Sequence, residues 1–110
     1  MTDAVCTALV TGGARRIGAA VVADLAAHGF AVAIHANRSF AEAGNLAARI
    51  AAKGGRAAAV RADLTDMDAA GRLVEDAAAA LGPVCLLVNC ASVFEDDSVR
   101  DFDWDGWDRH

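Results

Sequence analysis

The segment that decides the fold is V-C-T-A-L-V-T-G-G-A-R-R-I-G, which runs from Val5 to Gly18. Its first part, Val5 to Val10, is apolar and rich in β-forming residues, so it predicts a strand. A glycine-rich turn follows, and from there apolar residues recur at helical spacing, at Ile17, Ala20, Val21 and Leu25. A strand, a glycine turn and a helix in this order are typical of a site that holds a pyrophosphate. The six-residue step from Gly12 to Gly18 departs from the spacing G-x-G-x-x-G. Taken alone, the glycines could therefore form only a turn between strand and helix, without a binding function.

The rest of the chain repeats the alternation of strand and helix. Further strands are predicted at Phe30–His35, Ala57–Ala62 and Val84–Val88. We expect Ser39, with Glu42 three residues later, to form a capping box, and Thr65 to cap the third helix. The helices should stop at Gly29, Gly54-Gly55 and Gly82.

This alternation predicts an α/β fold with a doubly wound parallel sheet of the Rossmann type. The expected strand order is 3-2-1-4, in a three-layer α/β/α arrangement. Residues 1–110 are expected to form a single domain, because no linker or internal repeat interrupts them.

Composition excludes several classes of protein. The 110 residues are 55% hydrophobic and carry a formal net charge of -5, so a nucleic-acid partner is not expected. No apolar run reaches the ~20 residues of a membrane span, and the N-terminus does not resemble an export signal. The odd number of cysteines (Cys6, Cys85 and Cys90) predicts three free thiols in a reducing cytoplasm.

The residues after the second predicted strand discriminate between nucleotides. An NAD site usually has a carboxylate here to bind the ribose 2′-hydroxyl. This sequence instead reads H-A-N-R-S, from His35 to Ser39. The guanidinium of Arg38 and the hydroxyl of Ser39 suit a 2′-phosphate, which predicts NADP(H). The alternative is that Arg38 is a solvated surface charge and Ser39 only a helix cap, with no role in binding a phosphate.

Four motifs in order resemble the short-chain dehydrogenase/reductase family, within it the pteridine-reductase-like branch. They are T-G-G-A-R-R-I-G at 11–18, H-A-N-R-S at 35–39, A-D-L-T-D at 62–66 and L-V-N-C-A-S at 87–92. Arg16 replaces the middle glycine of the family, as is typical of that branch. Cys90 and Ser92 stand where the family has Asn and Gly, and Ser92 favours the same branch.

The resemblance implies roles for individual residues in binding NADP(H). The turn residues Gly12, Gly13, Ala14, Arg15, Arg16, Ile17 and Gly18 would surround the pyrophosphate. His35, Asn37, Arg38 and Ser39 would hold the adenosine ribose and its phosphate, and Asp63 and Leu64 would flank the adenine. Asn89, Ala91 and Ser92 would lie under the nicotinamide ribose, and Arg16 and Ser92 would also line a substrate pocket.

The proton-transfer residues of the family are not found in this sequence. The family uses a Ser, a Tyr and a Lys in a Y-x-x-x-K arrangement, whereas these residues include no tyrosine and a single lysine, Lys53. We therefore assign no catalytic residue and no metal ligand. The acidic residues between Glu95 and Asp108 lack the spacing of a calcium loop and are expected to form a solvated loop.

The functional hypothesis is therefore the cofactor-binding half of an NADPH-dependent oxidoreductase. Its small-molecule substrate would be reduced by hydride transfer at a carbonyl or a pteridine/imine-type bond. The residues would be part of a longer chain, which by the resemblance is a homo-oligomer. A non-catalytic dinucleotide-binding module, or a fragment that pairs with a second chain, is the alternative. An S-adenosylmethionine-binding domain is disfavoured by Arg38, because such a site usually has an acidic residue there.

Overall fold

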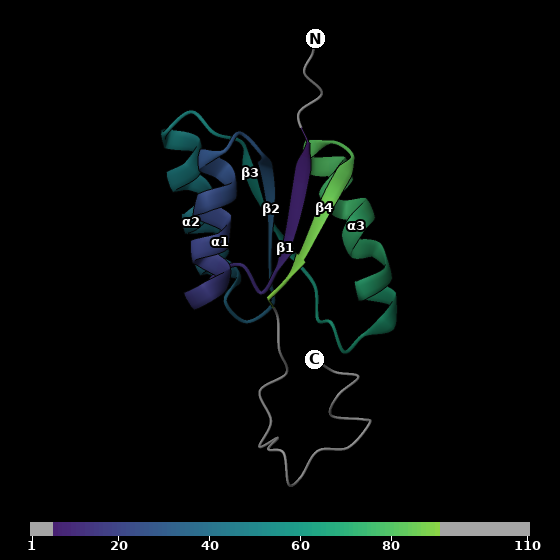
Figure 1. Cartoon of the computed structure of the whole chain (residues 1–110). Helices are drawn as coiled ribbons and strands as arrows, with labels where there is room; N and C mark the ends of the chain where they lie inside the picture. The colour runs from purple at the N-terminus through teal and green to yellow at the C-terminus, as the bar shows by residue number, and fades with distance from the viewer. Residues whose placement is uncertain (1–5, 91–110) are drawn as a thin grey trace, which may run out of the picture.

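The computed structural model describes residues 6–90, which form four strands and three helices (Figure 1). The strands are β1 (Thr7–Thr11), β2 (Ala31–Ala36), β3 (Ala57–Arg61) and β4 (Val84–Asn89), and the helices are α1 (Arg16–Ala27), α2 (Phe40–Ala52) and α3 (Met67–Leu81). All seven elements were predicted, and their ends lie within two residues of the expected positions.

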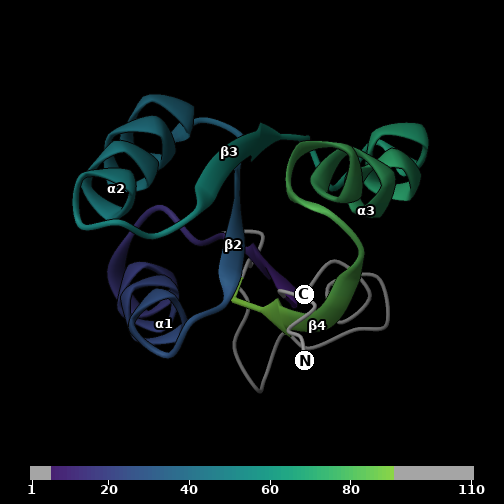
Figure 2. The same cartoon turned by 90° about the horizontal axis from the view of Figure 1, so that it is seen from above.

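The four strands form one parallel sheet in the order β3-β2-β1-β4, as the alternation predicted. Helices α1 and α2 cover one face of the sheet and α3 covers the other (Figure 2). This is the expected Rossmann-type, three-layer α/β/α arrangement. Within the described residues β4 lies at an edge, and its burial alternates, with Leu87 58% exposed.

Two apolar clusters fill the spaces between the layers. On the α1 and α2 side, Val10, Val22 and Ile34 pack with residues of α2. On the α3 side, Leu9 and Ala33 pack with Leu73. Neighbouring residues of β1 and β2 therefore point to opposite faces, which explains why both strands are mostly apolar and buried along their whole length.

Positive φ angles at glycines end the helices. Gly29, Gly54 and Gly82 have φ angles of 93°, 89° and 108°, so all three predicted stops are confirmed. None of the helices within residues 6–90 is long and apolar enough to cross a bilayer.

Two capping predictions are wrong. Ser39 occupies the N-cap of α2, but its hydroxyl makes no cap hydrogen bond, and Glu42 pairs with Arg15 instead. The N-cap of α3 is Asp66, whose carboxylate accepts hydrogen bonds from the N–H groups of Asp68 and Ala69. Both predictions placed a capping residue at the N-cap or one position before it. Which group the side chain then bonds to depends on residues that are distant in sequence.

The cysteine prediction is also corrected. A disulfide joins Cys6 to Cys85, and only Cys90 is a free cysteine in the part of the chain described. The two cysteines are 79 residues apart in sequence, but β1 and β4 are neighbours and their Cα atoms lie 5.8 Å apart. That separation suits a disulfide, and sequence spacing carries no information about it.

Candidate functional site

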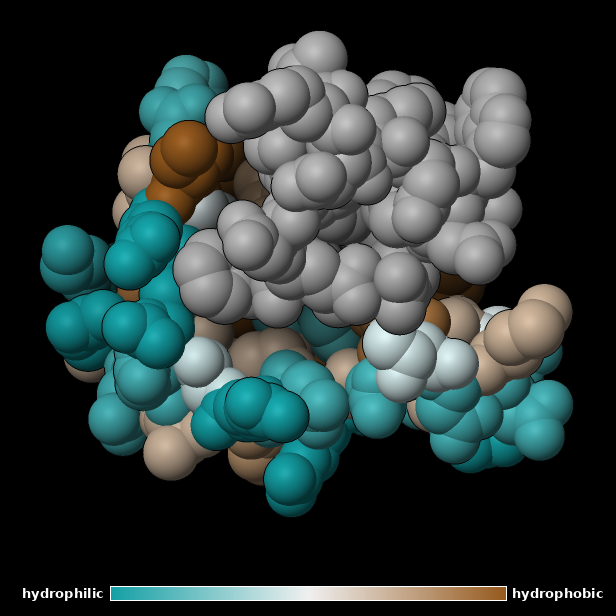
Figure 3. Space-filling view, turned by 90° about the horizontal axis from the view of Figure 1, so that it is seen from below, coloured by the Kyte–Doolittle hydropathy of each residue, from teal (hydrophilic) through white to brown (hydrophobic). Residues whose placement is uncertain are grey.

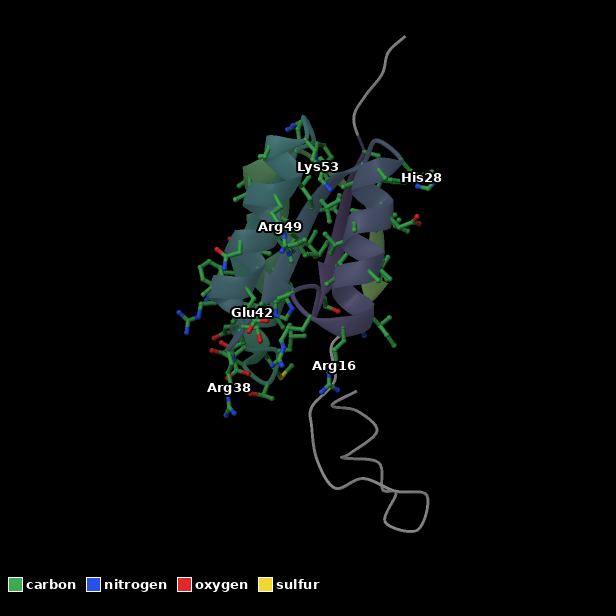
Figure 4. The ribbon with its side chains drawn as sticks, turned by 90° about the vertical axis from the view of Figure 1, so that its left-hand side faces the viewer. Arg16, His28, Arg38, Glu42, Arg49 and Lys53 are labelled. Atoms are coloured by element: carbon green, nitrogen blue, oxygen red, sulfur yellow. A yellow bond between two sulfur atoms is a disulfide. The ribbon has the colours of Figure 1, made fainter. Side chains whose placement is uncertain are left out.

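The predicted site residues gather at the carboxyl end of the sheet. Parallel strands all finish at the same edge, so the segments that follow β1, β2 and β3 meet there, beside the end of β4 (Figure 1). Arg16 and Arg38 lie at this end of the molecule, whereas His28 and Lys53 lie at the opposite end (Figure 4). Hydrophilic residues dominate the part of this face that is drawn in colour (Figure 3).

The turn after β1 brings its backbone directly against α1. Gly12 has a φ of 64°, a conformation that favours glycine. A Cβ atom on Gly18 would lie 2.1 Å from the carbonyl oxygen of Gly12, so only glycine fits at that point of α1. The family spacing of these two glycines therefore has a steric cause in this chain.

The first two amides of the turn are used inside the protein. The Gly12 N–H donates to Nδ1 of His35 at 2.9 Å, and the Gly13 N–H donates to the carbonyl of the same residue at 3.0 Å. Helix α1 begins at Arg16, and its N-cap Arg15 supplies no side-chain cap bond. Amide N–H groups at a helix start, together with its dipole, attract an anion.

Arg16 has an unusual backbone conformation. Its φ is 56°, and it is the one positive φ outside glycine among the described residues. The left-handed conformation costs an L-residue about 1–2 kcal/mol, which explains why a glycine serves at this position elsewhere in the resembled family. Both Arg16 and the adjacent Ile17 are exposed at the carboxyl edge, with Ile17 76% exposed.

The segment after β2 provides a cation at the start of α2. Arg38 is exposed, and Asn37 and Ser39 are half-buried beside it. The guanidinium of Arg61 lies 5.8 Å from the ring of Phe40, so a second arginine stands close to this helix start. The carboxylate of Glu42 is paired with Arg15 at 3.4 Å.

The turn after β3 is tied by Asp63. One of its carboxylate oxygens accepts hydrogen bonds from the hydroxyl of Thr65 at 2.6 Å and from the Thr65 N–H at 2.9 Å. These two bonds, followed by the positive charge of Arg38, lower the pKa of Asp63, while desolvation opposes them. Asp63 and the neighbouring Leu64 are exposed at the edge, and the pairing of Ala36 with Arg61 places the ends of β2 and β3 side by side.

The end of β4 is fastened to the end of β1. The hydroxyl of Thr11 donates to Oδ1 of Asn89 at 2.7 Å, and the Cys90 N–H donates to the Thr11 carbonyl at 3.0 Å. Asn89 thus lies beside the end of β1, where the glycine turn begins. The predicted positions Ala91 and Ser92 lie outside the described residues, as do the acidic residues from Glu95 onward.

The structure brings the described members of the predicted set to one edge, but His35 has a different place from the one expected. Its side chain is 4% exposed, and both ring nitrogens bond within the protein, Nδ1 to the Gly12 N–H and Nε2 to the Ala62 carbonyl at 2.8 Å. It therefore lies beneath the site and has no ring nitrogen left for a ligand. Its position inside an apolar strand was the available signal, because a buried histidine needs partners.

Sequence analysis also missed two partners of predicted residues. These are Thr65, which holds Asp63, and Thr11, which holds Asn89. A metal centre finds no support within residues 6–90, where no group of three His, Cys, Asp or Glu side chains is placed to hold an ion.

The fold and the site define an α/β protein of the class that binds a phosphate-bearing ligand at the carboxyl edge of its sheet. The family model for short chain dehydrogenase matches residues 6–110. The chain therefore belongs to the short-chain dehydrogenase family, as the four motifs predicted.

Curated relatives agree with this family. The chain is 36% identical over 102 residues to the short-chain dehydrogenase/reductase FrzI of Cladobotryum sp, a match that covers 93% of this chain and 40% of the relative. It is 43% identical over 90 residues to the L-rhamnose 1-dehydrogenase (NAD(P)(+)) of Azotobacter vinelandii, covering 79% and 35%. The chain thus spans about two fifths of the length of the relatives it matches.

Solved structures of related proteins share the fold of this chain. FolM alternative dihydrofolate reductase 1 from Brucella canis, complexed with NADP, is 53% identical with a TM-score of 0.82, covering 94% of this chain and 41% of that one. A blue fluorescent protein from a metagenomic library, in complex with NADPH, is 40% identical with a TM-score of 0.81, covering 94% and 43%.

Proposed function

We propose that this chain forms the NADP(H)-binding half of a short-chain oxidoreductase. The observation that carries the proposal is the juxtaposition of the helix α1 start with Arg38 at the carboxyl edge of the sheet. The amides of α1 suit a pyrophosphate, and the guanidinium suits the additional 2′-phosphate that distinguishes NADP(H) from NAD(H).

The residues present fit this cofactor. Gly18 leaves no side chain between the turn and the helix start, and the N-cap of α1 lacks a side-chain oxygen that would compete with a phosphate. Ile17 and Leu64 offer exposed apolar surface near the positions proposed for the pyrophosphate and the adenine. When bound, NADP(H) supplies or accepts the hydride of the reaction.

We propose reduction of a carbonyl or of a pteridine/imine-type bond for the full-length protein. The pteridine-type substrate is supported by Arg16 and by the 53% identity to a protein described as an alternative dihydrofolate reductase. Versicolorin reductase 1 of Dothistroma septosporum, at 31% identity over 102 residues, supports a reductase without indicating a pteridine, so carbonyl reduction stays among the proposals. The proton donor would come from outside these 110 residues, which contain no tyrosine.

For the full-length protein we also propose a homo-oligomer that acts on a small molecule. A dinucleotide-binding module without catalysis remains the alternative.

The test is to measure NADPH and NADH affinity in the full chain with Arg38→Ala and a control, Arg49→Ala. Both arginines are exposed, but Arg49 lies further along α2, away from the carboxyl edge (Figure 4). Loss of a charge-assisted bond to a phosphate, about 1.5–3 kcal/mol, should weaken NADPH binding by about ten- to a hundredfold. NADH binding and the control should be unchanged. Equal NADPH affinity in the two variants would contradict the assignment.

Turnover of a carbonyl substrate compared with a pteridine by the full chain separates the two reductions. Catalysis of neither, with NADPH still bound, would favour the module.

A further inference from the structure

We propose that His35 is a positioning residue that sets the geometry of the cofactor site, as a neutral imidazole with its proton on Nε2. The inference rests on the proposed binding of NADP(H) at the glycine turn. His35 lies near the end of β2, between β1 and β3 in the sheet, and only 4% of it is exposed.

The two hydrogen bonds of the ring fix its protonation state. A backbone N–H can only donate, so Nδ1 must accept from Gly12 without a proton of its own. A carbonyl can only accept, so Nε2 must carry the proton that is donated to Ala62. A single tautomer satisfies both partners, and the burial of the ring makes each bond costly to lose.

Each partner belongs to a different part of the proposed site. Gly12 is the first residue of the turn and touches Gly18, so its position determines where α1 starts. Ala62 directly precedes Asp63 and Leu64, the residues proposed to flank the adenine. The ring therefore ties the pyrophosphate side of the site to its adenine side across β2.

The backbone of the same strand supports this link. The Gly13 N–H donates to the His35 carbonyl, and the Ala62 N–H donates to the Ala36 carbonyl at 3.3 Å. Both the turn and the end of β3 are thus held to β2, and the side chain of His35 adds the second bond to each. A buried histidine with a purely structural role would stabilise the fold without a specific effect on the cofactor.

Two variants separate the bonds. Asn carries an oxygen where Nδ1 lies, so His35→Asn keeps an acceptor for Gly12 but is too short to reach Ala62. Gln carries its amide nitrogen near the position of Nε2, so His35→Gln keeps the donor to Ala62 but leaves Gly12 unpaired. Each variant loses one hydrogen bond, so we expect similar losses in stability.

In the full chain we expect His35→Gln to weaken NADPH binding by about tenfold, while His35→Asn stays within about threefold of the unmutated protein. The KM for NADPH should rise in His35→Gln while kcat is retained, because the ring touches no reacting atom. His28→Asn, at the exposed end of α1 away from the site, is the matched control and should change neither constant (Figure 4).

Equal effects of the Asn and Gln variants on NADPH affinity, following their effects on unfolding, would overturn the positioning role. Failure of the unmutated full chain to bind NADPH would instead overturn the proposed function. Long-range proton–nitrogen spectra of histidine-labelled protein test the ring directly. We expect the proton on Nε2 and slow exchange of the Gly12 amide, and a proton on Nδ1 would refute the inference.

Discussion

Replacing Gly18 by alanine should harm both the fold and the cofactor site. The new Cβ would lie 2.1 Å from the oxygen of Gly12, 2.9 Å from its carbonyl carbon and 2.9 Å from the Cα of Gly13. All three are backbone atoms, so no side-chain rotation relieves the contact. Real Cβ contacts essentially never fall below 3.0 Å, so the turn and α1 must move apart by about 0.9 Å.

This displacement determines the size of the expected effect. Helix propensity alone favours alanine over glycine by about 1 kcal/mol. Overpacking typically costs 1–3 kcal/mol, and the rigid partners here place the cost at about the upper value. The free energy of unfolding should therefore fall by about 2 kcal/mol. Loss of one amide–phosphate bond, about 1.5–3 kcal/mol, would raise the Kd for NADPH by about ten- to a hundredfold.

The matched control is Gly44→Ala on the exposed side of α2. A Cβ there meets nothing within 4 Å, so propensity acts alone and should stabilise the protein by about 0.5–1 kcal/mol. Urea unfolding and NADPH titration of both variants in the full chain provide the measurement. If Gly18→Ala gained stability as Gly44→Ala does and kept its affinity, the close approach of turn and helix would be refuted.

Three further predictions concern the backbone strain at Arg16, the carboxyl group of Asp63 and the disulfide between β1 and β4. Arg16→Gly should raise the free energy of unfolding by roughly 0.5–1 kcal/mol, because glycine adopts a φ of 56° without strain. If urea unfolding instead showed lower stability, the arginine side chain would contribute more than the strain costs. Asp63 has a lowered pKa, so its stabilising effect is complete above the ordinary value of 3.8 and is lost as pH falls through the lowered one. Thr65→Val should return the pKa of Asp63 toward 3.8 in a carboxyl NMR titration, and an unchanged titration would contradict the role of the hydroxyl. Alkylation of unfolded protein without reductant should spare Cys6 and Cys85, whereas labelling of both would disprove their disulfide.

The sequence was sufficient to predict the sheet and its order. Apolar runs at Leu9 and Ile34, with helical stripes between them, leave few ways to bury the strands. The glycine turn after the first strand indicates the Rossmann type of sheet, and that type has the order observed. The role of the glycines could also be predicted from the sequence, because Gly12 and Gly18 are required by the local geometry of the turn. The apolar runs and the glycine positions depend only on residues that are near in sequence and on the alternation of side chains between the two faces of a strand.

Side-chain partners across the sheet could not be predicted in the same way. The ring of His35 bonds to residues 23 and 27 positions away, and the hydroxyl of Thr11 bonds to a residue 78 positions away. The disulfide of Cys6 likewise depends on the adjacency of β1 and β4. Strand order makes these residues neighbours, but which atoms meet depends on register and rotamer.

The buried turn residues and the exposed Arg38 should respond differently to substitution. The side of the site proposed for the pyrophosphate depends on Gly12, Gly18 and His35, which are held by backbone contacts and buried hydrogen bonds, so a replacement that breaks one of these contacts should move the helix start. The proposed preference for NADP(H) depends instead on the exposed Arg38, whose replacement displaces no packed atom. The choice between the two dinucleotides should therefore be changeable at Arg38 with little effect on stability, whereas binding of either dinucleotide should be lost together with the turn.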